Sequence, residues 1–171
     1  NTVAMIAVLP GMAVGYVIVS VISQCVGSGD YEQVRYYGRK LIKWVYLLMG
    51  IVDILIILLI PVIIDLYGLS EATGDLAGKI ILFHNICAIV IWPISFSLPN
   101  VLRAASDVMY TMIIGVGSMW VFRILSGYLL GSVLGMGVFG VWVAMIIDWV
   151  VRSVCFLIRY HGGKWKHPAV R

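Results

Sequence analysis

Hydrophobic side chains gather into five runs along the chain, which cover residues 3–25, 45–64, 80–100, 108–130 and 138–158. A membrane-crossing α-helix needs about 20 mainly apolar residues, and each run reaches that length. Barrel strands would instead alternate apolar and polar residues over about ten positions, which these runs do not. Because hydrocarbon offers the backbone no hydrogen-bond partner, only helices remain. The pattern predicts an all-α polytopic membrane bundle of five transmembrane helices, with residues 1–171 as one unit.

The composition excludes several classes of protein. The chain is 62% hydrophobic and 12% charged, against roughly 45–50% and about 25% in soluble domains. The net charge of +4 would suggest nucleic acid only if the basic residues formed one face, whereas they lie between the hydrophobic runs. Three cysteines without metal-ligand spacing predict neither a disulfide framework nor a metal site. We therefore expect an integral membrane protein with no metal and no nucleic-acid partner.

Lysine and arginine in the connections predict the orientation, because cytoplasmic loops carry an excess of both. Nine of the 12 lie in connections that five crossings place on one side: Arg35, Arg39, Lys40, Lys43, Arg103, Arg159, Lys164, Lys166 and Arg171. The connection over 65–79 on the other side is mainly acidic. We expect a multi-pass protein of the cell membrane whose C-terminus is cytoplasmic.

The start of the chain predicts a missing part. No initiator methionine is present, and the chain opens directly into a hydrophobic run on the expected outer side. Transporters are usually built from paired repeats, and no repeat is visible within these residues. We expect an earlier helix and an N-terminal lobe to be absent from this sequence.

Four polar residues inside the runs, Arg123 among them, are candidates for a cation-coupling or substrate cavity. Asp53 has apolar neighbours in IVDILIILL, where a lone carboxylate would cost much solvation energy or take up a proton. His84 and Asn85 lie within ILFHNICAIVIWPISF, and histidine titrates near physiological pH, which suits proton coupling. For each residue, a hydrogen bond to a neighbouring helix is the alternative interpretation.

Charged residues in the fourth and fifth runs have other possible roles. Arg123 either extends to the outer headgroups, pairs with a carboxylate or lines the exit path. Asp148 and Arg152 are four residues apart in the fifth run, so they share one helix face and we expect a structural ion pair. Arg103 and Asp107 have the same spacing and predict a similar pair in a solvated turn.

The segment GSGDYEQVRYYGRKLIKW after the first run predicts an interfacial helix. Asp30 can cap it, and Arg35, Arg39 and Lys43 repeat every four residues to form a basic, lipid-facing stripe. We expect this helix to lie at the cytoplasmic headgroups, where anionic lipids and aromatic side chains hold it. Membrane lipids are therefore expected partners.

Glycines and prolines predict where helices approach and bend. The G-x-x-x-G spacing of Gly11 with Gly15, and of the glycines at 127, 131 and 135, indicates close packing. The four prolines in or beside apolar runs should kink or break helices; they are Pro10, Pro61, Pro93 and Pro99.

Three segments in this order resemble the C-terminal half of the multidrug and toxic compound extrusion (MATE) family. They are VISQCVGSGDYEQVRYYGRK, LPNVLRAASDVMYTM and GMGVFGVWVAMIIDWVVRSVCFLIRYHGGKWK. Proteins of that family have twelve helices in two six-helix lobes, so the five runs resemble helices eight to twelve. The resemblance implies an antiporter that exports amphipathic or cationic small molecules while H⁺ or Na⁺ enters, with rocking lobes and no further cofactor.

The chain departs from the family in one respect. Family members often carry a cation-site carboxylate on the helix that corresponds to residues 80–100, and none lies between Lys79 and Asp107. That departure puts a carboxylate-type Na⁺ site in doubt and favours His84.

Other functions compete with multidrug efflux. A lipid-linked glycan flippase of the same superfamily would need several cavity cations for its pyrophosphate substrate, but only Arg123 and Arg152 lie within runs. Nucleophile, zinc and diphosphate–magnesium motifs of membrane enzymes are missing from the sequence, so we expect no enzyme and no catalytic residues. A structural membrane subunit that moves nothing stays open.

Overall fold

The computed structural model describes residues 2–166, so Arg171, counted above among the basic residues, lies outside the described part. That part is helical throughout, with no strand among the described residues. Its elements are α1 (Thr2–Gly27), α2 (Tyr31–Leu58), α3 (Ile60–Leu66), α4 (Glu71–Trp92), η1 (Pro93–Ser97), α5 (Leu98–Ala104), α6 (Val108–Ser118), η2 (Met119–Leu125), α7 (Ser126–Tyr128), η3 (Leu129–Val133), α8 (Gly137–Gly162) and η4 (Lys164–Lys166).

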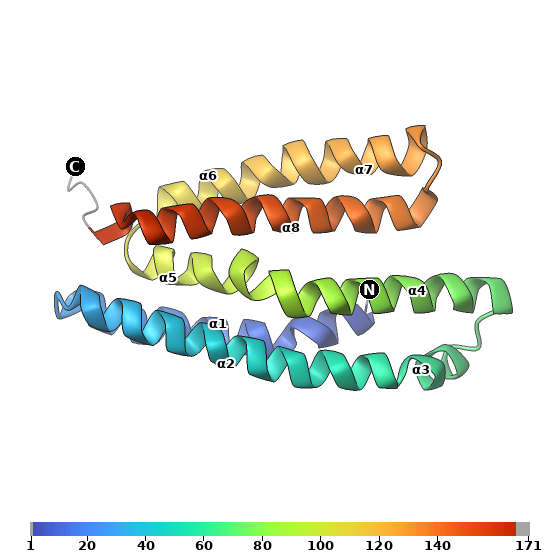
Figure 1. Cartoon of the computed structure of the whole chain (residues 1–171), viewed down its shortest axis with the longest axis horizontal. Coiled ribbons are helices and arrows are strands. Elements are labelled where there is room, and N and C mark those ends of the chain that lie inside the picture. The colour runs from blue at the N-terminus through green and yellow to red at the C-terminus, as the bar shows by residue number, and fades with distance from the viewer. Residues whose placement is uncertain (1, 167–171) are drawn as a thin grey trace.

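Five helices are long and apolar enough to cross a membrane, which confirms the predicted fold class. They are Thr2–Gly27, Tyr31–Leu58, Glu71–Ala104, Val108–Val133 and Gly137–Gly162. Figure 1 shows them side by side, with α4 and α5 between the α1–α2 pair and the α6–α8 group. We call the end with the α1–α2 turn, the α5–α6 turn and the C-terminus of α8 the basic end, and the end with α3 the opposite end.

The prediction of a separate interfacial helix after the first run is wrong. Residues Tyr31–Leu58 form one continuous helix, so the basic stripe is the first part of α2. Asp30 does cap this helix, because its carboxylate accepts a hydrogen bond from the backbone N–H of Gln33 at 3.0 Å. After that cap no proline interrupts the chain before position 61, and the helix continues into the apolar run.

The prolines disturb the helices in different ways. Pro10 lies inside α1, while Pro61 is the second residue of α3, which follows a break at Leu59. Pro93 begins the π-helical segment η1, where the backbone hydrogen bonds join residues five apart instead of four. The π-helical segments η2 and η3 were not predicted, since no proline accompanies them. The third and fourth long helices are therefore irregular near or beyond their middle.

Two glycines permit the closest helix contacts. A Cβ on Gly11 would lie against the ring of Trp92 and 2.7 Å from the sulfur of Met49, so α1, α2 and α4 meet at this residue. A Cβ on Gly140 of α8 would lie 2.7 Å from the carbonyl carbon of Leu130. The G-x-x-x-G glycines at 127 and 131 lie on the helix that faces α8. A Cβ on either would lie 3.3 Å or more from the nearest atom of α8.

Candidate ion-coupling and substrate site

A cavity of about 290 Å³ opens at the opposite end of the bundle. The first residues of α1, part of α3, one side of α4 and Trp142 of α8 form its wall. Most of these side chains are apolar, and His84 and Asn85 are the polar groups that α4 contributes. An apolar cavity with a few converging polar groups is the usual form of a small-molecule site.

His84 is held by aromatic rings rather than by hydrogen bonds. Its side chain is 3% exposed. Its ring meets Trp142 and Trp149 of α8 edge-on, with centroids 5.2 and 5.6 Å away. The Nδ1 atom is buried and has no hydrogen-bond partner among the described residues. The two tryptophans therefore fix the ring beside the cavity and leave one nitrogen available.

Asn85 also presents an unused polar atom. Its Nδ2 donates to the carbonyl of Ile81 in its own helix at 2.7 Å, whereas its buried Oδ1 has no partner within the described chain. A buried polar atom without a partner costs about 1–3 kcal/mol, so natural proteins seldom keep one without a reason. The cavity wall thus carries two such atoms on adjacent residues.

Asp53 lies inside the bundle, and it does not line this cavity. Its side chain is fully buried, and neither carboxylate oxygen has a partner among residues 2–166. Met49, one turn earlier in α2, packs at Gly11 together with Trp92 of α4. One helical turn is about 5.4 Å, so Asp53 lies one turn further toward the end that holds the cavity. The fold therefore brings His84 and Asn85 together and leaves Asp53 deeper.

Arg123 is not part of this site. It lies in η2 with an exposed side chain, and it is not among the residues that form the cavity wall. Of the four predicted cavity residues, only two line the cavity.

Asp148 and Arg152 form an ion pair that also joins two helices. Arg152 Nε lies 3.0 Å from Asp148 Oδ1 and 2.8 Å from Ser118 Oγ, and Nη2 donates to the carbonyl of Gly115 at 2.9 Å. Asp148 is fully buried, and the Arg152 side chain is 13% exposed. The guanidinium also lies 5.4 Å from the ring centre of Phe96. These contacts tie α8 to α6 and keep both charges largely buried in the bundle.

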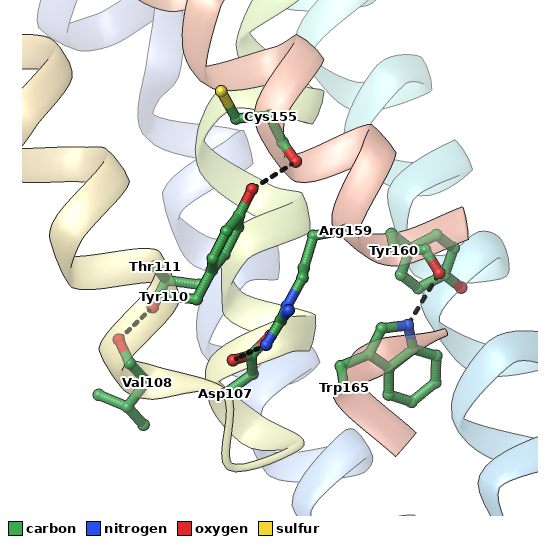
Figure 2. A network of polar contacts seen from close by, with 8 residues as sticks. All are labelled: Asp107, Val108, Tyr110, Thr111, Cys155, Arg159, Tyr160 and Trp165. Carbon is green, nitrogen blue, oxygen red and sulfur yellow. Dashed lines mark hydrogen bonds and ion pairs between the residues drawn. The ribbon is translucent and has the colours of Figure 1, made fainter. Parts of the chain in front are cut away.

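The predicted pairing of Arg103 with Asp107 is wrong. Asp107 accepts two hydrogen bonds from Arg159, at 2.7 and 3.0 Å, as Figure 2 shows. Arg103 instead donates to Thr111 and Asn100, both at 3.4 Å. Asp107 precedes α6 after a turn in which Ser106 has a φ of 68°. A contact across 52 positions leaves no signal in local spacing, so the sequence could not reveal it.

Tyr110 and Trp165 complete the network at the basic end. Tyr110 donates to the carbonyl of Cys155 at 3.0 Å and its ring lies 4.6 Å below the Arg159 guanidinium. Trp165 stacks on Tyr160 with centroids 5.6 Å apart and donates to its carbonyl at 2.8 Å. Figure 2 shows these groups along the last turns of α8. Sequence reasoning missed all of them.

Comparison with known proteins identifies the family. The MatE family model matches residues 1–129. The chain is 26% identical over 167 residues to "Uncharacterized transporter YisQ" of Bacillus subtilis (96% of this chain, 36% of that protein). It is 27% identical over 168 residues to "Probable multidrug resistance protein NorM" of Thermotoga maritima (95% and 35%), and 20% identical over 170 residues to "Probable multidrug resistance protein YoeA" of Bacillus subtilis (99% and 36%).

No solved structure matches the chain significantly. The chain spans about a third of the length of the curated relatives it matches. Because the family model covers most of the sequence, the chain belongs to the MatE family of membrane transporters.

Proposed function

We propose that the chain supplies five helices of the C-terminal lobe of a secondary antiporter. This antiporter exports small amphipathic or cationic toxic compounds and is driven by entry of H⁺ or Na⁺. Family membership and relatives named as probable multidrug resistance proteins support the transport class. The observation that carries the coupling step is the cavity with His84 and Asn85, each with an unpaired buried atom.

The chemistry of this site suits exchange of a proton against a cation. Neutral His84 offers a lone pair and the Asn85 carbonyl oxygen is an acceptor, so both can bind a proton donor or a cationic group. Protonated His84 would repel a cationic substrate from the same cavity. Mutually exclusive binding of proton and substrate is the requirement for antiport. Asp53, one layer deeper, is a second group that can carry a proton.

The location in the membrane completes the proposal. We place the basic end in the cytoplasm and the cavity toward the outer side of the cell membrane, because the connections at the basic end hold the excess of lysine and arginine. The N-terminal lobe is then the partner that closes the transport pathway. No enzymatic step is required, since transport of this kind breaks no covalent bond.

The experiment is ethidium efflux from drug-sensitive cells that express the full reading frame containing this chain. A pH gradient and a Na⁺ gradient are imposed separately, because efflux that follows one of them names the coupling ion. We expect His84→Ala to weaken proton-driven efflux much more than Asp148→Asn, which alters a buried charge away from the cavity wall. Membrane abundance of each variant is measured in parallel.

Three results would count against the proposal. Absence of efflux under either gradient, with good expression, would favour a flippase or a non-transporting subunit. Equal loss of activity in both variants at equal abundance would remove the role assigned to His84. Full proton-driven activity of His84→Ala would move the coupling to another group, with Asp53→Asn as the next variant.

A further inference from the structure

The basic end contains a second cavity, which no part of the transport proposal uses. It measures about 250 Å³, and its lining residues are Arg35, Arg39, Tyr160 and His161. Two of them come from the early turns of α2 and two from the last turns of α8, so the fold places segments 125 positions apart around one small space.

Both arginines are available to a ligand. Arg39 uses its Nε for a 3.4 Å bond to the carbonyl of Arg35, which leaves its terminal nitrogens without a partner in the described chain. The guanidinium of Arg35 has no partner among residues 2–166. The three ion pairs in this range all join other residues. Neither Asp30 nor Glu32, the acidic side chains at the start of α2, forms an ion pair among the described residues.

The remaining wall is fixed and polar. The Tyr160 hydroxyl donates to the carbonyl of Arg35 at 3.4 Å, and the tyrosine ring is stacked on Trp165, so this side of the cavity is rigid. Figure 2 shows Tyr160 and Trp165 against the neighbouring helix at the end of α8. His161 Nδ1 lies 3.0 Å from the carbonyl of Leu157. Because a carbonyl only accepts, Nδ1 is the donor in this contact, and Nε2 can donate to an anion only when the ring carries a second proton.

Further positive charge surrounds the cavity. A Cβ on Gly163, whose φ of 68° ends α8, would lie 3.9 Å from Arg35 Nη2 and 4.0 Å from Lys166 Cδ. The Arg35 guanidinium therefore lies beside the chain segment that bears Lys164 and Lys166. Planar guanidinium groups in pairs match the oxygens of a phosphate, which accepts several charge-assisted hydrogen bonds.

We infer that this cavity binds the phosphate group of an anionic phospholipid and clamps the start of α2 to the end of α8. Its position at the end of two membrane helices brings it to headgroup depth. Basic cavities between membrane helices are known to bind anionic headgroups. The inference is independent of the transport proposal, since it requires only that the helices cross a membrane.

The test measures lipid binding to the purified full-length protein in nanodiscs of neutral lipid with a low fraction of phosphatidylglycerol. Native mass spectrometry counts the retained anionic lipid, and about 0.3 M salt screens attraction that is merely long-range. Arg35→Gln/Arg39→Gln removes both cavity charges. The matched control, Lys40→Gln/Lys43→Gln, removes two exposed charges from the same helix that do not line the cavity.

We expect the arginine double variant to lose about tenfold or more in affinity for the anionic lipid, and the lysine control less than about threefold, because the arginines line the cavity and the two lysines do not. Equal losses in both would overturn the inference and leave general surface attraction. Binding of inorganic phosphate to the native protein as tight as that of the lipid would also overturn it in favour of a free anion.

Two single variants test the cavity even if the arginine double variant does not fold. Arg39 and His161 are exposed, so the single variants Arg39→Gln and His161→Gln should fold normally and each lose about threefold in lipid affinity. Unchanged binding in both of these variants would refute the cavity as the lipid site.

Discussion

Removing Arg152 tests how the last helix keeps a charge inside the bundle. Arg152→Met retains the apolar stem and deletes the guanidinium, which leaves the fully buried Asp148 without its cation. Breaking one partner of a buried pair costs about 3–5 kcal/mol, because the remaining charge is uncompensated. The two lost bonds to Ser118 and Gly115 of α6 add about 0.6 kcal/mol each, the average for contacts between membrane helices. The stranded carboxylate therefore dominates the loss.

Removing the charge of the other partner, Asp148, should lower the free energy of unfolding much less. In Asp148→Asn the amide oxygen still accepts from Arg152, and the arginine keeps Ser118 and Gly115 as acceptors, so we expect about 1 kcal/mol. In the double variant no buried charge is stranded, and we expect a loss smaller than the sum of the two single losses by at least about 1 kcal/mol.

The assay is the free energy of unfolding of the complete protein in mixed micelles, titrated with a denaturing detergent. Arg123→Met is the matched control, since it removes an exposed arginine from the neighbouring helix, and should change stability by less than about 0.5 kcal/mol. Equal losses for Arg152→Met and Asp148→Asn, or additive losses in the double variant, would refute the assignment of the pair to structure.

Two further predictions concern stability. Gly140→Ala brings a Cβ within 2.7 Å of the backbone of the facing helix, so it should cost about 1–3 kcal/mol; Gly117→Ala, with open space around it, should be neutral or stabilising in the same unfolding titration. Asp107→Asn weakens the two bonds from Arg159 and should lower the thermal midpoint, whereas Asp75→Asn, from a pair that is 69% and 77% exposed, should not. Equal shifts for the members of either pair would contradict the packing described here.

The sequence could predict what depends on local pattern. Five apolar runs predicted five long helices, and the spacing of Asp148 and Arg152 placed both on one face, where they lie 3.0 Å apart. It could not predict that the basic segment and the second apolar run form one helix, because a capped basic segment fits a separate helix as well as the first turns of a longer one. The sequence pattern does not predict the π-helical segments either, since they change the backbone without requiring a particular side chain.

Contacts between distant segments were beyond sequence reasoning for a different reason. Asp107 has Arg103 four residues before it and Arg159 52 residues after it, and only the packed positions of α6 and α8 select the second. His84 illustrates the same limit. Its polarity marked it as a candidate, but the two tryptophans that hold it belong to α8, and nothing in local spacing connects them.

Polar groups divide the described bundle into two regions with different tasks. At the basic end, Asp107, Tyr110, Arg159 and Trp165 all have partners that connect α8 to its neighbours or to its own last turn. The buried atoms without partners lie elsewhere, on α2, α4, η1 and α8: they belong to Asp53, His84, Asn85, Ser95, Ser97, Asp148 and Trp149. Satisfied networks rigidify a structure, whereas unsatisfied buried groups carry a free-energy cost that a ligand, a proton or another helix can remove. Substitutions at the basic end should therefore lower stability with little effect on transport per folded molecule. Substitutions along α4 should instead alter transport with little effect on stability.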